Sequence, residues 1–340
     1  MDPSLYQAAA RIAPGEGRAA QLAQLYALAV SPGSPQALAA RLRNGLALVA
    51  ALLLACGLIF WIAANWQAQT RMFKLGLIEG ALALSVLAAL LWPRVRTAAL
   101  LCATLVLGVL LAFIGQTYQT GADAWQLFAV WAALALVWVG LARSDVLWTL
   151  WVLIAALGIA LWAGRFDIWN VLFVEHESLP QLVIRMGLWL APALVPALVA
   201  CVPWLRVKGD VAWWSHRVAL GCALAAWAGI GIVHLFDFAG RQSGAALVLS
   251  ALLIGGSIWV SLQGRLQDFV ALCLAVLAAN VWVLSAVARA LFHGNDFEAM
   301  LLFFSLLTLA CLGGSVRGLM AVQRRMRAPS APSTAAKEVV

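Results

Sequence analysis

Ten apolar runs, most of them about 18–22 residues long, constrain this chain more than any other feature of its sequence. A helix rises about 1.5 Å per residue, so roughly 20 apolar residues cross the hydrocarbon core of a bilayer. Backbone in lipid must satisfy its own hydrogen bonds, which favours helices. The period-two alternation of a transmembrane β-barrel is absent. We therefore predict an all-α, polytopic helical membrane protein with about ten transmembrane helices.

Composition agrees with this fold class. The chain is 64% hydrophobic and 11% charged, whereas soluble domains average about 45–50% apolar and about 25% charged residues. The predicted spans are residues 45–64, 73–92, 98–115, 125–142, 146–163, 182–204, 217–239, 245–263, 268–290 and 299–319.

The spans divide the chain into four regions. Residues 1–44 are predicted to form a short cytoplasmic helical lead, with a helix near 18–30. Residues 45–163 and 164–319 are predicted membrane units of about five spans each. Residues 320–340 are a basic and then disordered cytoplasmic tail.

The distribution of basic residues predicts the orientation. With the N-terminus inside, sixteen of the 22 Lys and Arg residues fall on the inner side. Cytoplasmic loops of membrane proteins carry an excess of Lys and Arg, so both termini are predicted to be cytoplasmic. The net charge of +8 therefore indicates orientation in the bilayer and not nucleic-acid binding.

No motif in the sequence indicates catalysis. HExxH, GxSxG and P-loop patterns are absent. The six cysteines all fall inside apolar runs without a CxxC pair, which favours buried small hydrophobic residues over disulfides or metal ligands. We expect no cofactor and no enzymatic activity. The cysteines are Cys56, Cys102, Cys201, Cys222, Cys273 and Cys311.

The densest polar signal lies between Phe113 and Trp131, in the sequence FIGQTYQTGADAWQLFAVW. Apolar runs on both sides are long enough to span a bilayer, so this is a short connection at the outer membrane surface. Gln116, Tyr118 and Asp123 give it more hydrogen-bonding capacity than a turn requires.

Glu79 is the strongest single candidate for a functional residue because it lies inside the second predicted span. A carboxylate at that depth is disfavoured and usually faces protein or water. It is either a group that binds a proton or an ion, or a structural acid paired with Lys74, Arg71 or Gln116.

The outer ends of the first four spans are predicted to form one polar cluster, because consecutive spans joined by short loops usually pack as neighbours. This cluster would be a pocket for a small ligand or headgroup, or a polar contact that holds the four helices together. Its candidate residues are Asn65, Trp66, Lys74, Glu79, Gln116, Tyr118, Gln119, Asp123 and Trp125.

A weaker candidate group lies on later outer turns. His234 and Asp237 share one helical face, and with His293 and Asp296 they would form a set that zinc accepts. Interfacial hydrogen bonding is the default interpretation of these residues.

Most of the 17 tryptophans stand near predicted span ends and indicate an interfacial belt rather than a cofactor site. The examples are Trp61, Trp66, Trp92, Trp125, Trp148 and Trp204.

Two motifs resemble those of a known family. AANW at 63–66 ends the first span, and GQTYQTGAD begins at Gly115. With the basic residues that open the second span, they resemble the bacterial predicted membrane proteins called domain of unknown function (DUF) 2157, best from about Arg41 to Ala163. The matching residues are Asn65, Trp66, Gly115, Gln116, Tyr118, Gly121, Asp123 and Trp131.

The resemblance implies a multi-pass protein of the bacterial inner membrane and supplies no reaction. Family members commonly look like parts of envelope systems, which implies as partners the bilayer and either another membrane or envelope protein or a second copy of the chain. We therefore predict a non-catalytic component of such a system. The alternative is a secondary transporter or channel-like protein with an outer-leaflet site around Glu79.

Overall fold

The computed structural model describes residues 35–65, 67, 69–119, 121–164, 178–205, 207, 213–236, 243–263, 268–291 and 297–327. All regular elements in these ranges are helices. Nine of the described helices are long and apolar enough to cross a bilayer, and one bent pair makes a tenth span if its halves are counted together. The predicted all-α, polytopic fold is confirmed.

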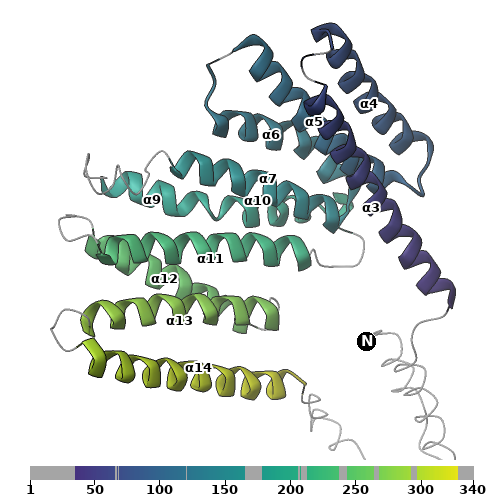
Figure 1. The fold of residues 1–340 in the computed structure, drawn as a ribbon. Coiled ribbons are helices and arrows are strands. Elements are labelled where there is room, and N and C mark those ends of the chain that lie inside the picture. The colour runs from purple at the N-terminus through teal and green to yellow at the C-terminus, as the bar shows by residue number, and fades with distance from the viewer. Residues whose placement is uncertain are drawn as a thin grey trace, which may run out of the picture.

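The helices of the first half are α3 (Pro35–Ala64), α4 (Arg71–Leu91), α5 (Arg96–Tyr118), α6 (Ala124–Ala142) and α7 (Asp145–Ala163). Those of the second half are α9 (Leu179–Leu188), α10 (Ala191–Ala200), the short 3₁₀ helix η2 (Pro203–Leu205), α11 (Trp213–Phe236), α12 (Ser243–Leu262), α13 (Phe269–Leu291) and α14 (Phe297–Arg327). In Figure 1 the helices α7, α11, α13 and α14 form successive rows, and α3 to α6 fan out beyond α7.

Two helices extend furthest beyond the predicted spans. Helix α3 has 30 residues and crosses position 45 without a break, which makes it about 45 Å long. Helix α14 has 31 residues and includes the basic segment that ends at Arg327. The helix predicted near 18–30 and the disordered end predicted after 327 lie outside the described residues.

The sixth predicted span, residues 182–204, is not one straight helix. Helices α9 and α10 meet at a bend of 52°, and the N–H of Leu190 bonds to the carbonyl of Gly187 in a tight turn. Pro192 follows as the second residue of α10, where its missing N–H breaks no bond within that helix. The single span predicted here is thus two helices with a complete break between them.

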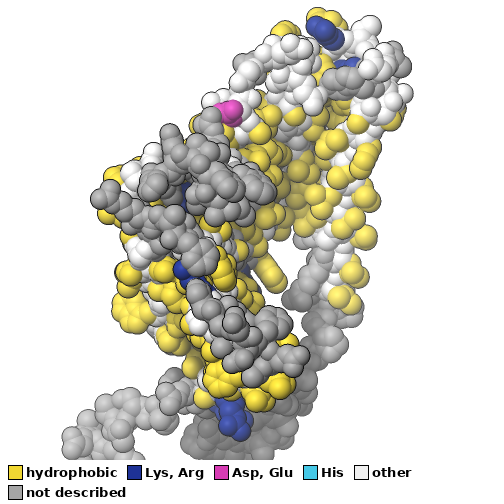
Figure 2. All heavy atoms as spheres, turned by 60° about the vertical axis from the view of Figure 1, so that its left-hand side comes forward, with side chains coloured by type: hydrophobic (Ala, Val, Ile, Leu, Met, Phe, Trp, Pro, Cys, Tyr) yellow, Lys and Arg dark blue, Asp and Glu magenta, His cyan; other side chains and the backbone are white. Residues whose placement is uncertain are grey.

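Helix α11 lies at the centre of the second half and packs against α7, α12 and α13. By contrast, α14 packs against α13, and no residue in its most apolar window is buried. Hydrophobic side chains dominate the described surface of the face shown in Figure 2, as expected for helices whose outer sides meet lipid.

Tryptophan indoles link neighbouring helices by hydrogen bonds. On α6, the indole N–H groups of Trp131 and Trp138 donate to the carbonyl and the hydroxyl of Thr104 at 2.8 and 2.9 Å. Three other pairs repeat this pattern between helices: Trp151 with the carbonyl of Ala132, Trp227 with the carbonyl of Met186, and Trp282 with the hydroxyl of Ser250. A buried indole N–H needs such a partner.

The tryptophans named above therefore do not all lie in the predicted interfacial belt. Trp61, Trp92 and Trp204 are exposed, as belt residues would be. Trp148 is 1% exposed and packs in the core, so its assignment to the belt was wrong. Trp66 lies outside the described residues.

Two glycines make room for these tryptophans. A Cβ at Gly108 would overlap the indole ring of Trp131. A Cβ at Gly231 would lie 2.5 Å from the indole nitrogen of Trp282 and 2.6 Å from the hydroxyl of Ser250. Both positions require glycine for close approach rather than for backbone freedom.

All six cysteines are free thiols. Cys56 and Cys201 are exposed on the isolated chain and the other four are partly exposed, so the expectation that they are buried was wrong. Cys102 and Cys222 still pack against core clusters, and the thiol of Cys311 donates to the side-chain oxygen of Asn280 on α13 at 3.3 Å.

Candidate functional site

The GQTYQTGAD segment begins in the last turns of α5 and ends at the N-cap of α6. Gln116 and Tyr118 are helical, and Tyr118 is 67% exposed. Gln119 ends α5 in the left-handed conformation with φ of 44°, and Gly121 has φ of 66°. Left-handed residues are a common way to end a helix and reverse the chain. Thr120 lies outside the described residues.

Asp123 organises the start of α6. Its backbone N–H donates to the side-chain oxygen of Gln126 at 3.2 Å, as part of a capping box. The indole N–H of Trp125 donates to its carboxylate at 3.1 Å. These contacts span two or three residues of sequence, so this part of the motif stabilises its own turn.

The candidates on α3 and α4 take different positions. Asn65 donates to the carbonyl of Trp61 at 2.9 Å and so closes its own helix. Lys74 is 4% exposed and lies on the same face of α4 as Ile78, which is fully buried. Glu79 lies on the exposed side of α4, and among the described residues it makes no hydrogen bond or ion pair.

Two cavities meet at Gln116. One, of about 630 Å³, lies between α3, α4, α5 and α6 and is otherwise apolar, with Ile62, Ile78 and Trp131 in its wall. The second, of about 520 Å³, lies between α5 and α6 and includes Asp123. The structure thus brings Gln116 and Asp123 to one cavity. That Asn65, Glu79 and the turn form a single cluster stays a prediction.

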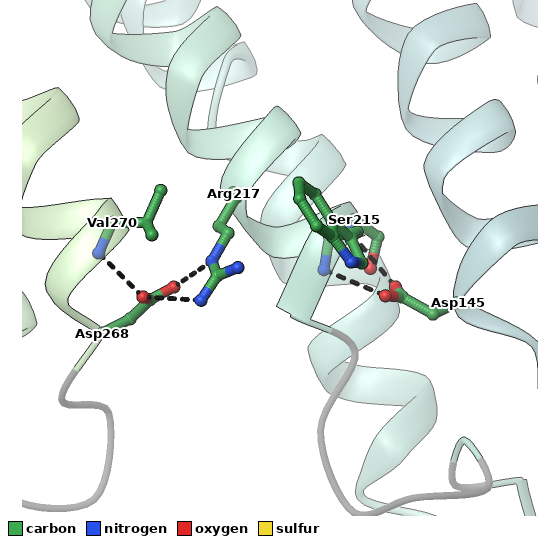
Figure 3. Close-up of polar contacts among 6 residues, drawn as sticks. Asp145, Ser215, Arg217, Asp268 and Val270 are labelled. Atoms are coloured by element: carbon green, nitrogen blue, oxygen red, sulfur yellow. Dashed lines mark hydrogen bonds and ion pairs between the residues drawn. The ribbon is translucent and has the colours of Figure 1, made fainter. Parts of the chain in front are cut away.

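A different polar network joins three helices at the opposite membrane side, which the charge pattern assigns to the cytoplasm (Figure 3). The carboxylate of Asp145, at the start of α7, accepts hydrogen bonds from the backbone N–H groups of Trp214 and Ser215 at 2.9 and 3.1 Å. Asp145 therefore caps the N-terminus of α11 from another helix, where its negative charge is favourable.

Arg217, one turn further along α11, forms a two-pronged ion pair with Asp268. Its Nε and Nη2 atoms donate to the two carboxylate oxygens at 2.7 and 2.9 Å. Asp268 also accepts from the backbone N–H of Val270 at 2.9 Å, at the beginning of α13. The guanidinium of Arg217 lies 5.4 Å from the ring centre of Trp214. Together with Asp145, these contacts fix the ends of α7, α11 and α13 to one another.

Asp268 precedes the membrane-spanning part of α13. Burial alone would raise the pKa of its carboxyl, but the hydrogen bonds from Arg217, Val270 and Ala271 and the charge of Arg217 outweigh burial and leave this pKa below its ordinary value. The ion pair therefore stabilises the fold most where Asp268 is ionised.

Sequence reasoning missed this network, although a signal was present. Asp145 and Asp268 each stand immediately before or at the start of an apolar run, after an inner loop. Asp is a preferred helix N-cap residue. The pattern predicts a cap, but it does not say that Asp145 caps a helix 69 residues away.

The structure also brings Arg185 of α9 to His234 of α11, with 3.3 Å between Nη2 and Nε2. Both side chains are buried, at 6% and 4% exposure. Because a guanidinium only donates hydrogen bonds, Nε2 of His234 is the acceptor in this contact. Of the weaker candidates, Asp237, His293 and Asp296 lie outside the described residues, so the zinc interpretation stays untested.

The comparisons with known proteins bear on the first half of the chain. Residues 8–148 match the family model described as "Predicted membrane protein (DUF2157)". This match confirms the resemblance drawn from AANW and GQTYQTGAD. It begins earlier than Arg41, and it ends at Trp148, so the DUF2157-like region covers α3 to α6 and the first turn of α7. No curated protein and no solved structure matches the chain.

Proposed function

We propose that this integral membrane protein is a non-catalytic component of a bacterial envelope system, located in the inner membrane, that acts by binding another membrane protein or a second copy of itself. The family match and the apolar helices establish a membrane protein. One observation supports the proposal that the protein acts by binding a partner: Glu79 lies on the exposed face of α4.

The depth of Glu79 makes that position unfavourable in an isolated chain. It is eight residues from the start of α4 at Arg71, or about 12 Å along the helix axis. A carboxylate facing lipid at such a depth is disfavoured by up to about 3 kcal/mol on insertion scales. A partner that supplies a hydrogen-bond donor would remove this cost.

The same face of α4 is shaped for a second helix. Gly76 and Gly80 are exposed and stand four residues apart, and no atom lies within 4 Å of a Cβ built at either position. Small residues at this spacing let two helices approach closely in a membrane. The buried residues Lys74 and Ile78 face the other way, toward the bundle. The carboxylate and the two glycines thus form one available interaction face.

Site-specific cross-linking in native membranes tests the proposal. A photoreactive residue at Met72, which is 78% exposed on α4, should give a discrete adduct with one membrane protein or with a second copy of the chain. Gly80→Leu should reduce this adduct at least tenfold by blocking close approach. Gly57→Leu on α3 is the matched control, because Gly57 is also exposed and open, and it should leave the adduct unchanged.

The proposal fails if Met72 gives no more adduct than Leu54, which is 70% exposed on α3. Equal loss of the adduct in Gly80→Leu and Gly57→Leu would contradict it too.

Glu79→Gln separates association from the alternative of a transporter with a site around Glu79. A contact tolerates the neutral isostere, whereas a site that binds a proton or an ion does not. The larger cavity beside α4 is lined by Ile78 and not by Glu79, which favours association.

A further inference from the structure

The inner ends of α5, α6 and α7 line an open polar cavity of about 650 Å³ that lies apart from the outer turn and from α4. Arg96 and Thr97 reach it from the start of α5, and Arg143 and Ser144 from the connection between α6 and α7. We propose that this cavity is a binding site for a phosphate group, carried by an anionic lipid headgroup or by a soluble phosphate compound.

The two arginines come from different inner loops and meet at one cavity. The Nε atom of Arg96 donates to the carbonyl of Ala89 at 3.2 Å, which anchors the side chain and leaves its two terminal nitrogens as further donors. Guanidinium groups suit phosphate because they donate two parallel hydrogen bonds. Basic pockets between membrane helices on the cytoplasmic side are a known way to hold lipid phosphates.

Backbone N–H groups add to the positive character of the cavity. Helix α5 begins at Arg96 and α7 begins at Asp145, and neither receives a hydrogen bond from the side chain of its N-cap residue. The N-terminus of a long helix favours anions. Arg143 has φ of 53° directly after helical Ala142, and this sequence of conformations turns successive N–H groups toward one side.

One acid also lines the cavity, and its charge is already compensated. The carboxylate of Asp145 accepts both N–H groups at the start of α11, at 2.9 and 3.1 Å (Figure 3). Two cationic side chains and one acid, whose carboxylate also caps α11, therefore line the cavity. Orientation in the bilayer requires basic residues on this side, but not their convergence on one cavity.

Arg143 offers a substitution that separates binding from folding. Left-handed backbone is favourable for glycine and costly for arginine. Arg143→Gly therefore relieves backbone strain while it removes one proposed phosphate ligand. Arg96→Gln removes the other ligand, and Arg94→Gln is the matched control, since Arg94 lies two residues away and does not line the cavity.

The experiment uses the full chain in nanodiscs of phosphatidylcholine alone. Inorganic phosphate and short-chain phosphatidylglycerol are titrated separately, and the rise in Tm is followed by tryptophan fluorescence. We expect at least one probe to stabilise wild type and Arg94→Gln equally. Arg143→Gly and Arg96→Gln should each raise the apparent Kd at least tenfold, while each variant still unfolds in one cooperative thermal transition without ligand.

Competition between the probes identifies the source of the phosphate. Mutual displacement shows that both probes share one site. Stabilisation by inorganic phosphate alone assigns the site to a soluble compound, and stabilisation by the lipid alone assigns it to a headgroup. The proposal is overturned if neither probe raises the Tm of the wild type. It is also overturned if Arg94→Gln weakens binding as much as Arg143→Gly, since general surface charge would then explain the effect.

Discussion

The outer turn and the inner network use polar residues in opposite ways. The outer turn carries most of the polar residues that stand out in the sequence, yet the hydrogen bonds of Asp123 with Gln126 and Trp125 join positions only two or three residues apart. The inner network has few residues, but its hydrogen bonds join positions 51 to 70 residues apart. A dense polar motif therefore does not identify the contacts that hold the bundle together. Isolated charged residues at helix ends do so here.

The largest effect is expected from Arg217→Met, which breaks the inner network. Removing the guanidinium leaves the carboxylate of Asp268, with a side-chain exposure of 3%, without its cationic partner. Breaking a buried ion pair in this way costs about 3 kcal/mol. Unfolding of the purified protein in mixed detergent micelles would measure this loss.

The double variant Arg217→Met with Asp268→Asn is the control for that prediction. It removes the unpaired charge and keeps a side chain that can cap α13, so it should recover most of the lost stability. If the double variant is as unstable as Arg217→Met, the ion pair is not the reason for the loss.

The pH dependence of stability gives a second test of the same ion pair. The pKa of Asp268 is lowered in the folded protein, whereas the pKa of an unfolded Asp is about 3.9. Its stabilising contribution is therefore complete above about pH 4 and is lost as the pH falls through the lower folded pKa. The difference in stability between wild type and Asp268→Asn should be constant from pH 6 to 8 and shrink in acid. A difference that grows in acid would show that the sign of the pKa shift is wrong.

Gly108→Ala should have the next largest effect, because the added methyl group overlaps the indole ring of Trp131. Overpacking of this kind typically costs about 1–3 kcal/mol. The control is Gly115→Ala on the same helix, where no atom lies within 4 Å of the new Cβ. Equal unfolding free energies for the two variants would mean that α5 and α6 separate without cost at this point.

Thr104→Val tests the polar part of the same contact. The substitution keeps the shape of the side chain but leaves the indole N–H of Trp138 without its acceptor. Hydrogen bonds between membrane helices contribute about 0.6–1.7 kcal/mol. Thr149→Val is the control, since the hydroxyl of Thr149 bonds the carbonyl of Asp145 within its own helix. It should lose less stability than Thr104→Val in the same unfolding assay.

The smallest effect is expected at the outer turn. Asp123→Ala removes the acceptor of the Trp125 indole and the acid of the capping box. Because both contacts are local and exposed, the loss of stability should be about 0.5 kcal/mol. A loss as large as that of Arg217→Met would contradict the contrast between the two regions and give the turn a role in holding the helices together.

The sequence determined by itself that the chain folds as membrane helices, because a run of about 20 apolar residues leaves the backbone no other way to satisfy its hydrogen bonds in lipid. It placed the breaks near Asn65, Gln119 and Ser144, where turn-forming residues interrupt the apolar runs.

Only the tertiary structure decided which residues meet across the bundle. Trp148 looked interfacial by its place near a span end, but the packing of α7 against its neighbours buries it. Glu79 and Ile78 are neighbours in the sequence, but the rotation of α4 sets Glu79 on the exposed side, while Ile78 packs in one cluster with Phe113 of α5. Asp145, Arg217 and Asp268 stand on separate inner loops and helix ends, and their pairing depends on how α7, α11 and α13 pack. Spacing along one helix fixes which residues share a face, whereas rotation and neighbour choice depend on contacts between segments far apart in the chain.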